Sequence, residues 1–536
     1  MALRYIPCFL PLSFMPETFR QALIVVYFLL VLGMAAFAFH RVKMLVLCLR
    51  HRRGAAGLST GVDGLAADAR VPLVCVQCPV YNEPLVIEAL LEAVAGLRWP
   101  DGRIEIQILD DSTDDTTARI AAWLAARPGV AGRMRHIRRE TRGGYKAGAL
   151  AHGMALTAAE FFAVFDADFR PAPDFLTVLM PHFTHAPGIG LVQARWEFNN
   201  RNASLLTRFQ GLFLDAHFTV EQVARHAAGL FFNFNGTAGI WRRAALEEAG
   251  GWTPDTVTED LDVSYRAQLR GWRFVYRGDY GVDSELPENI TAFKSQQRRW
   301  TKGGIQVMRK QLAIILRAPG LAGRIKREAA WHLLVGFVHP VLLAFAALLV
   351  PYFIWVAAPG QADAIALQPV LLVFTFWATI GLYLAGQRLR GGSPGRALLI
   401  LLASPLMLSF GLAMSVTTTV AVVEGLFQRG GEFVRTPKGG ARAVVGGLFG
   451  RLRTRGFFFV LSGVESVFGA VMLGGAVYFF RRGQPLAALL LGCKAAGFLG
   501  MAALSFRDLL PPVPTGRRAD VFRRFLVGRP PVAGNP

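Results

Sequence analysis

Two aspartates stand directly after a buried-looking apolar run. The stretch FFAVFDADFRP covers residues 161–171, and in it a single residue separates Asp166 from Asp168. Side chains two positions apart in an extended backbone point to the same side. The two carboxylates can therefore converge on one cation or one phosphate at a strand end. A strand followed by an acidic turn gives the same short pattern, so the rest of the chain has to decide between the two interpretations.

Two more polar clusters follow predicted strands. Short apolar runs alternate with helical patterns from residue 71 onward, with helices expected near 84–97, 114–126, 145–157 and 173–180. This alternation predicts an α/β fold, a parallel sheet covered by helices. Ligands bind such sheets beyond the carboxyl ends of the strands. Residues 79–84 end the first strand, residues 110–114 the second and residues 166–168 the fourth, which predicts one shared site.

The sequence has no phosphate-binding glycine loop of the P-loop or dinucleotide type. Residues 143–148, GGYKAG, come nearest but lack the spacing. A nucleotide held through carboxylates and a divalent cation fits better. Mg²⁺ or Mn²⁺ takes hard oxygen ligands, typically one or two carboxylates plus substrate phosphates.

A further acidic pair begins a predicted helix. Thr258 is suited to cap that helix and Gly271 to end it, so Glu259 and Asp260 fall in its first turn. Acidic residues favour helix N-termini in any case, which is the structural alternative. The functional interpretation makes one of the two acids a general base.

A later helix carries a pattern suited to a sugar. Gln296, Arg299 and Trp300 are spaced i, i+3 and i+4, so they share one face. An indole stacks on the apolar face of a sugar ring, while amide and guanidinium groups reach its hydroxyls. A surface helix resting on a membrane would give the same pattern.

The composition indicates a membrane protein. The 536-residue chain has a formal charge of +21, but no basic block is interleaved with aromatics as in single-strand nucleic-acid binders. Its basic residues instead flank long apolar runs, as on the cytoplasmic side of spans. Runs of roughly bilayer-crossing length occur at about 21–39, 332–357, 366–386, 457–480 and 485–505.

A sixth apolar stretch, at about 397–425, is expected to be a re-entrant or interfacial helix pair. It contains Pro405 and has basic residues on both sides, which a single crossing would place on opposite sides of the bilayer. The expected organisation is an N-terminal span (1–45), a cytoplasmic domain (46–325), a C-terminal membrane region (326–510) that includes an interfacial helix and loop (about 397–455), and a basic tail (511–536).

Taken together and in order, these motifs resemble the processive family 2 glycosyltransferases of the cellulose synthase superfamily over roughly residues 70–510. The similarity extends to Lys146-Ala-Gly148, to Asn233-Phe-Asn-Gly-Thr237 and to Phe433-Val-Arg-Thr-Pro-Lys438. The resemblance implies a GT-A fold between transmembrane helices and an inverting transfer from a nucleotide sugar.

The resemblance also implies roles for individual residues. Nucleotide-sugar binding would fall to Tyr81, Glu83, Asp110, Asp111, Lys146 and Asp166, and the metal to Asp166 and Asp168. Asp260, beside Glu259, would be the catalytic base. Acceptor binding would involve Gln296, Arg299, Trp300, Asn235, Gly236 and Thr237. A gating loop would contain Phe433, Thr436 and Lys438.

The expected function is a membrane-embedded, processive β-glucan or mannan synthase that uses UDP-glucose or GDP-mannose with Mg²⁺ or Mn²⁺ and moves its product across the bilayer. One span before the domain makes the layout similar to mannan and glucomannan synthases. Abundant Arg, Ala and Gly suggest a bacterial inner membrane, with accessory export subunits as possible partners. The alternative is a non-processive transferase acting on a membrane lipid, like ceramide glucosyltransferase. A second alternative is a membrane transporter with a soluble domain, which would be expected to carry ionisable residues in several of its spans.

Overall fold

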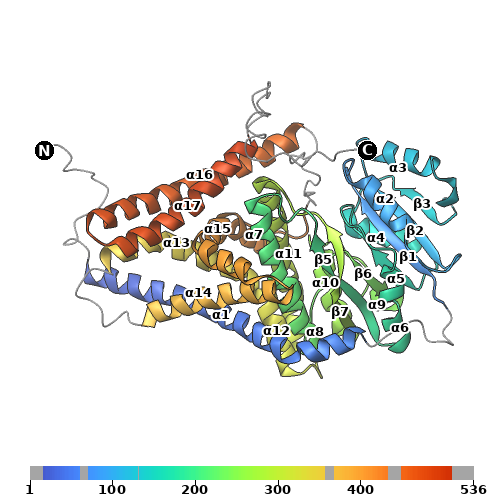
Figure 1. The fold of residues 1–536 in the computed structure, drawn as a ribbon, viewed down its shortest axis with the longest axis horizontal. Helices are drawn as coiled ribbons and strands as arrows, with labels where there is room; N and C mark the ends of the chain where they lie inside the picture. The colour runs from blue at the N-terminus through green and yellow to red at the C-terminus, as the bar shows by residue number, and fades with distance from the viewer. Residues whose placement is uncertain (1–15, 61–70, 131, 357–366, 432–447, 510–536) are drawn as a thin grey trace, which may run out of the picture.

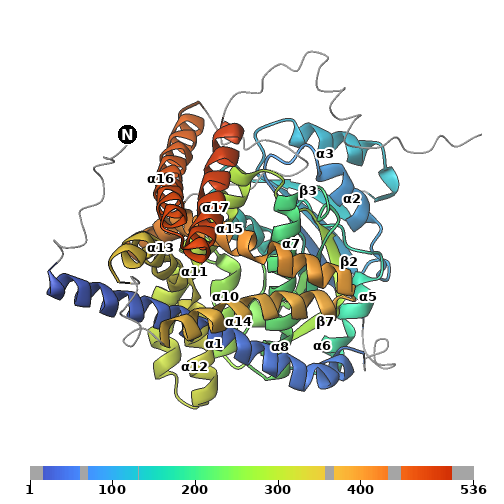
Figure 2. The same ribbon diagram turned by 60° about the vertical axis from the view of Figure 1, so that its left-hand side comes forward.

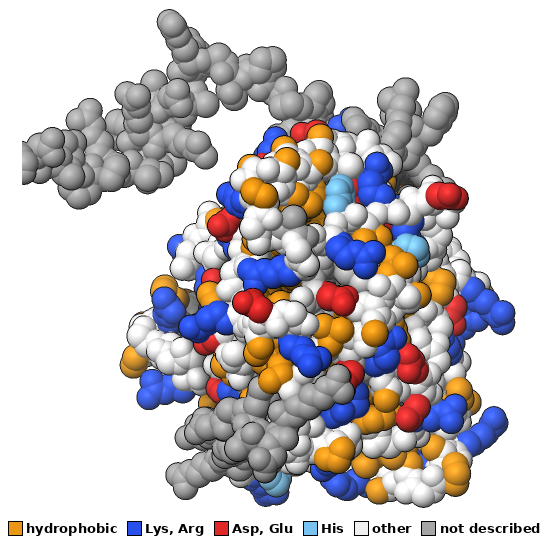
Figure 3. Space-filling view, turned by 90° about the vertical axis from the view of Figure 1, so that its right-hand side faces the viewer, with side chains coloured by type: hydrophobic (Ala, Val, Ile, Leu, Met, Phe, Trp, Pro, Cys, Tyr) orange, Lys and Arg blue, Asp and Glu red, His pale blue; other side chains and the backbone are white. Residues whose placement is uncertain are grey.

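The computed structural model describes residues 16–60, 71–130, 132–356, 367–431 and 448–509. A sheet with its covering helices forms one end of the molecule, and long apolar helices form the other (Figure 1). The far end of the sheet domain carries interspersed basic and acidic side chains (Figure 3), as a water-exposed surface does.

The sheet has seven strands in the order β3-β2-β1-β4-β6-β5-β7. β1, β2, β3 and β4 are parallel, as the sequence predicts, and β5 and β7 are parallel to each other. β6 runs antiparallel to both β4 and β5 and joins the two halves. The strands are β1 (Val74–Val80), β2 (Ile104–Asp110), β3 (Met134–Arg138), β4 (Phe161–Val164), β5 (Ile189–Phe198), β6 (Gly239–Arg242) and β7 (Arg273–Ser284).

Both faces of the sheet are buried, which explains the unbroken apolar run of β1. Val74, Val76 and Cys78 pack on the side of α2 (Ile87–Ala95), whereas Cys75 packs on the side of α4 (Tyr145–Ala155). Alternate residues of a strand face opposite sides, so a strand covered on both sides needs apolar residues at nearly every position. The other helices of this domain are α3 (Thr116–Ala125), α5 (Phe175–Leu179), α6 (Pro181–His185), α7 (Leu205–Ala216), α8 (Gln222–Ala227), α9 (Arg243–Glu248) and α10 (Glu259–Leu269).

Among the described residues, six helices are long and apolar enough to cross a membrane. α1 runs from the far end of the apolar helices to the underside of the sheet domain near α8 (Figure 1). The helices of this part are α1 (Glu17–Thr60), α12 (Gly323–Leu334) with α13 (Val338–Trp355), α14 (Leu367–Leu389), α15 (Pro394–Phe427), α16 (Leu448–Arg481) and α17 (Pro485–Leu509).

α15 differs from the helix pair expected at 397–425, because it is one continuous helix. Proline has no N–H, so Pro405 leaves the carbonyl of Leu401 without its usual helical donor. The hydroxyl of Ser404 donates to that carbonyl at 2.7 Å. A side-chain donor of this kind allows an apolar helix to continue through proline. An interfacial position for this helix stays a prediction.

α11 (Ile290–Arg317) lies between the sheet domain and the apolar helices (Figures 1 and 2). Asp508, near the end of α17, accepts a hydrogen bond from the first amide of α11, that of Ile290, at 2.8 Å. The ammonium of Lys294 lies 2.7 Å from both the Glu465 carboxylate of α16 and the Ser505 hydroxyl of α17, and the Lys294 and Glu465 side chains are fully buried. The C-terminal hairpin therefore fixes the start of α11.

We expect Glu465→Leu to destabilise the protein by about 3–5 kcal/mol, because it leaves the Lys294 ammonium buried without its carboxylate. Thermal unfolding in detergent should show a lower midpoint. The double variant Lys294→Met, Glu465→Leu should recover most of the loss, because no buried charge remains. A double variant as unstable as the single one would show that the pair does not act as a unit.

Candidate active site

A single cavity beyond the carboxyl ends of β1 and β4 gathers most of the predicted site residues. They come from segments far apart in the chain: the turns after β1, β2 and β4, the start of α4, the loop before β6, and the helices α10 and α11. The predicted residues that line it are Tyr81, Glu83, Asp111, Lys146, Asp166, Asp168, Asn235, Gly236, Glu259, Asp260, Gln296, Arg299 and Trp300.

Lys146 connects three of these segments. Its ammonium lies 2.5 Å from a carboxylate oxygen of Asp166 and donates to the carbonyl of Gly236 at 2.9 Å. Gly236 has φ +86°, and a Cβ added there would lie 2.9 Å from a carboxylate oxygen of Asp260. Glycine is needed at this position both for its backbone conformation and for the space that Asp260 occupies.

Thr237, which is predicted to bind the acceptor, does not line the cavity. Its side chain is fully buried. The hydroxyl oxygen accepts the backbone N–H of Asp166 at 2.9 Å, and the hydroxyl lies 3.4 Å from the carbonyl of Val164. Thr237 therefore positions the end of β4, from which Asp166 reaches the cavity.

Asp166 and Asp168 both line the cavity, as their spacing predicts. One oxygen of Asp166 meets Lys146, and one oxygen of Asp168 accepts the Ser284 hydroxyl at 2.8 Å. No cluster of three or more His, Cys, Asp or Glu suited to a metal occurs among the described residues. Two carboxylates facing one cavity fit Mg²⁺ or Mn²⁺, which completes its coordination with substrate phosphates and water.

Asp111, rather than Asp110, faces the cavity. The carboxylate of Asp110 accepts the amide of Ser112 at 2.8 Å and the hydroxyl of Thr117 at 2.7 Å, and lies 2.9 Å from His136. Burial alone would raise the pKa of Asp110, but these hydrogen bonds lower it to about 2. Asp110 does not line the cavity, because its oxygens are used within the protein, and its assignment to the nucleotide stays a prediction.

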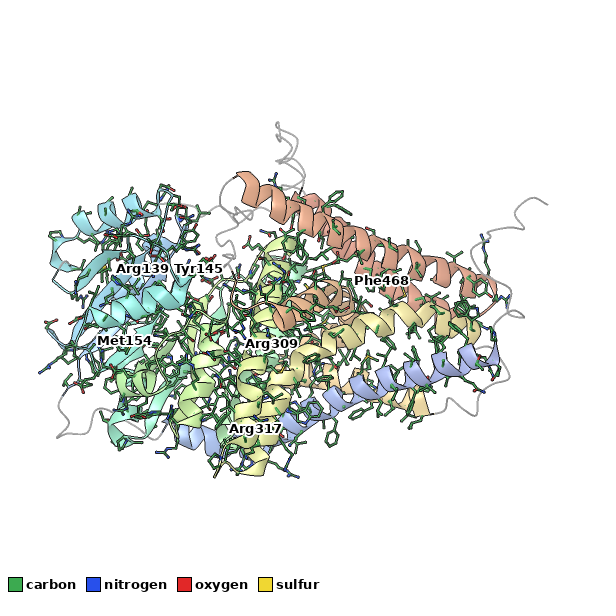
Figure 4. The ribbon with its side chains drawn as sticks, turned by 180° about the vertical axis from the view of Figure 1, so that it is seen from behind. Arg139, Tyr145, Met154, Arg309, Arg317 and Phe468 are labelled. Carbon is green, nitrogen blue, oxygen red and sulfur yellow. The ribbon has the colours of Figure 1, made fainter. Side chains whose placement is uncertain are left out.

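Asp111 pairs with Arg139 through two contacts, Nε to one carboxylate oxygen at 3.0 Å and Nη2 to the other at 2.5 Å. Arg139 also donates to the carbonyl of Tyr145 at 3.1 Å, and Figure 4 shows the two residues side by side. The two contacts between Arg139 and Asp111 therefore hold the Asp111 carboxylate in one orientation at the cavity.

Sequence inspection missed several lining residues, among them Arg142, Trp196 and Phe198. The guanidinium of Arg142 lies 3.3 Å from the centroid of the Tyr81 ring, a cation–π arrangement at the cavity wall. Trp196 and Phe198 also line the cavity and share one face of β5. Their alternate spacing in ARWEF and the position of Arg142 just before two glycines were the available signals.

The acids at the start of α10 share a buried environment. Burial and the adjacent Glu259 raise the pKa of Asp260 to about 7, and burial also raises the pKa of Glu259. Burial opposes the charge of Lys146, but attraction to Asp166 and Glu259 outweighs it and raises the Lys146 pKa. Arg299 interacts electrostatically with all four nearby acids, Glu259, Asp166, Asp260 and Asp168.

Thr258 precedes α10 as predicted, but its side chain makes no capping hydrogen bond within the described residues. The hydroxyl oxygen of Thr258 would lie 2.4 Å from a Cβ added to Gly303 of α11. Thr258 therefore packs tightly against α11, and this packing explains why its hydroxyl is not aimed at the helix backbone. Gly271, with φ +94°, follows the end of α10 as expected.

Gln296, Arg299 and Trp300 line the cavity together from one face of α11, which confirms the spacing argument. The predicted gating residues Phe433, Thr436 and Lys438 lie outside the described residues.

Comparisons with known proteins agree with this arrangement. Residues 161–414 match the family described as Glycosyl transferase family group 2. The chain is 44% identical over 301 residues to rice glucomannan 4-beta-mannosyltransferase 1, covering 53% of this chain and 56% of the relative. It is 47% identical over 259 residues to glucomannan 4-beta-mannosyltransferase 2 of Arabidopsis thaliana, covering 48% of each.

A longer match, 40% identical over 392 residues, is to glucomannan 4-beta-mannosyltransferase 7 of Arabidopsis thaliana and covers 70% of this chain and 66% of the relative. The chain spans about half the length of most curated relatives it matches. Among solved structures, the mannosyltransferase PcManGT from Pyrobaculum calidifontis in complex with GDP-Man and Mn²⁺ is similar at 21% identity and a TM-score of 0.49, over 74% of this chain and 99% of that one. The mixed α/β sheet is typical of the GT-A fold that the resemblance implied.

We expect Asp260→Asn to lower the transfer rate by about 10²–10⁴-fold, because an amide cannot accept the proton of an attacking hydroxyl. Nucleotide-sugar binding, measured by calorimetry, should stay near the wild-type value. The exposed residue Asp115 provides a matched control, since Asp115→Asn changes the same group outside the cavity. Loss of binding in Asp260→Asn would exclude the base assignment.

The pH dependence of the rate should follow Asp260. Only the carboxylate form accepts a proton, and a pKa of about 7 means that this form is lost as the pH falls below neutrality. We therefore expect kcat/KM, which reports the free enzyme, to fall about tenfold per pH unit below about 7 and to level off above it. A kcat/KM that stays constant from pH 5 to pH 8 would contradict this environment for Asp260.

Proposed function

The chain carries a family 2 glycosyltransferase domain, and from that premise we propose that it transfers mannosyl units from GDP-mannose to the end of a growing β-linked glycan. Mannose is favoured over glucose because the relatives named above are mannosyltransferases. The observation that carries the proposal is the cavity in which acids, three cationic side chains and the indole of α11 meet.

The proposed reaction is one displacement. The acceptor hydroxyl attacks the anomeric carbon, a new carbon–oxygen bond forms there, and the bond to the diphosphate breaks. Asp260 accepts the hydroxyl proton, and the electron pair of the broken bond leaves with the nucleoside diphosphate. One base suffices for inversion, so no second catalytic acid is needed.

The charged end of the cavity suits the diphosphate. Lys146 would contact phosphate oxygens, and Asp166 and Asp168 would hold Mg²⁺ or Mn²⁺. A divalent cation bound there would neutralise the charge that develops on the leaving diphosphate. Asp111 and Tyr81, with Arg142, line the part of the cavity where the nucleoside would lie.

The acceptor end is formed by α11. Trp300 would stack on the terminal sugar, with Gln296 and Arg299 reaching its hydroxyls. Because the start of α11 contacts α16 and α17, the acceptor site adjoins the apolar helices. We propose that the glycan stays bound between additions and passes through the membrane as it grows.

The nucleotide-sugar site is proposed to face the cytoplasm, in line with the basic residues that flank the apolar runs. The bacterial inner membrane and the accessory export subunits remain predictions, and the relatives named above are plant enzymes. The domain limits expected from the sequence, 1–45, 46–325, 326–510 and 511–536, are likewise proposed.

The test is to supply purified membranes with GDP-mannose and UDP-glucose separately and to digest any product with linkage-specific hydrolases. We expect a long polymer from GDP-mannose that a β-1,4-mannanase degrades. Polymer from UDP-glucose alone would correct the donor. A short, solvent-extractable glycolipid as the sole product would overturn the proposal in favour of lipid glycosylation.

A further inference from the structure

The chain that leaves α15 lies between α11 and the segment that leads to the catalytic acids. The amide of Gly430 donates to the carbonyl of Asp255 at 2.9 Å. Lys302 of α11 donates to the side-chain oxygen of Gln428 at 2.7 Å. Arg309 of α11, near the centre of the molecule in Figure 4, donates to the carbonyl of Gly425 at 3.1 Å. The end of α15 is therefore bound on two sides.

One side chain connects all three segments. Gln306 of α11 is 3% exposed and uses both ends of its amide. Its oxygen accepts the backbone N–H of Val257 at 2.9 Å. Its nitrogen donates to the carbonyl of Gly430 at 2.7 Å and lies 3.3 Å from that of Gln428.

Val257 stands just before the acids. It lines the cavity, and Thr258 and then Glu259 and Asp260 follow it. Gln306 itself does not line the cavity, so any effect it has on transfer must act through Val257 and the residues after it.

Close packing leaves little freedom at these contacts. A Cβ added to Gly425 of α15 would lie 2.7 Å from Ile305 of α11, and one added to Gly303 would lie 2.4 Å from Thr258. The backbone of α15 therefore contacts Ile305 directly, and the backbone of α11 contacts Thr258 directly. Because this packing leaves no free space, a movement of α15 relative to α11 must either displace the groups that are hydrogen-bonded to Gln306 or break those hydrogen bonds.

We propose that Gln306 is a positioning residue that couples the end of the apolar helix α15 to the segment that holds the catalytic base. The inference rests on the proposed function, because Asp260 is the base only if the site transfers a sugar. A purely structural amide would affect stability alone, since a buried polar group only has to satisfy its hydrogen bonds.

The experiment uses the full-length protein in nanodiscs. Gln306→Met keeps the length of the side chain but removes both hydrogen bonds, whereas Gln306→Glu keeps an acceptor for Val257 and lacks the amide donor. Gln107→Met is the matched control, because Gln107 is a fully buried amide that donates to the carbonyl of Gly153 at 3.0 Å, away from the cavity. Each variant is assayed for kcat, for KM of the nucleotide sugar, and by hydrogen exchange.

For Gln306→Met we expect kcat to fall by about 10²-fold, as a small misplacement of a catalytic group does, with KM close to wild-type. Peptides covering 255–260 and 425–431 should both exchange faster. Gln306→Glu should increase the exchange rate of the peptide 425–431 more than that of the peptide 255–260, and it should retain a higher kcat than Gln306→Met. Gln107→Met should change neither peptide.

Two outcomes would overturn the inference: kcat unchanged in Gln306→Met, or kcat lowered equally in Gln306→Met and Gln107→Met with no faster exchange at 255–260. Failure of the proposed function is distinguishable, because the wild-type protein would then transfer no sugar from GDP-mannose or UDP-glucose while the exchange differences could still be measured.

Discussion

The attraction between the carboxylates of the cavity and two cations, Lys146 and Arg299, is the interaction on which the site depends. Asp166, Asp168, Glu259 and Asp260 face a cavity that burial makes costly for charge, and Lys146 and Arg299 interact with them there. Carboxylates crowded without cations would take up protons instead. The pKa values of the two α10 acids are already raised, which leaves one of them able to accept a proton near neutral pH.

The apolar helices support this cavity through α11. α11 carries the indole and the guanidinium of the site, and its first turn is fixed by Asp508 and by the buried contact of Lys294 with Glu465. Its later turns contact α15 and, through Gln306, the backbone before Glu259 and Asp260. α11 is therefore held in its first turn by α16 and α17 and in later turns by α15, at the boundary between the α/β domain and the apolar helices.

Spacing along single elements allowed much of this to be predicted from sequence. The i, i+2 aspartates after β4 and the i, i+3, i+4 face of α11 depend only on local geometry, and both are confirmed in one cavity. Which of two adjacent residues faces the cavity was harder to predict from the sequence. Asp110 and Asp111 are adjacent, and only the positions of His136, Thr117 and Arg139 decide which of them faces the cavity. The position of Thr237 outside the cavity likewise depends on its hydrogen bond with Asp166, and the continuity of α15 depends on the hydrogen bond from Ser404 to Leu401. No sequence pattern reveals either bond. The β5–β6–β7 half of the sheet mixes strand directions and gave no alternating signal.

Calorimetric titration of GDP-mannose into the purified protein, with and without Mn²⁺, tests the central claim most directly when repeated on Asp168→Asn. Asp168→Asn removes one charge from the cavity and keeps an oxygen that can accept the Ser284 hydroxyl. The account predicts tight binding that needs the cation in the wild-type protein, and binding that is weak and indifferent to the cation in the variant. Equal affinity in all four titrations would show that the carboxylates after β4 do not gather around a cation-bridged diphosphate.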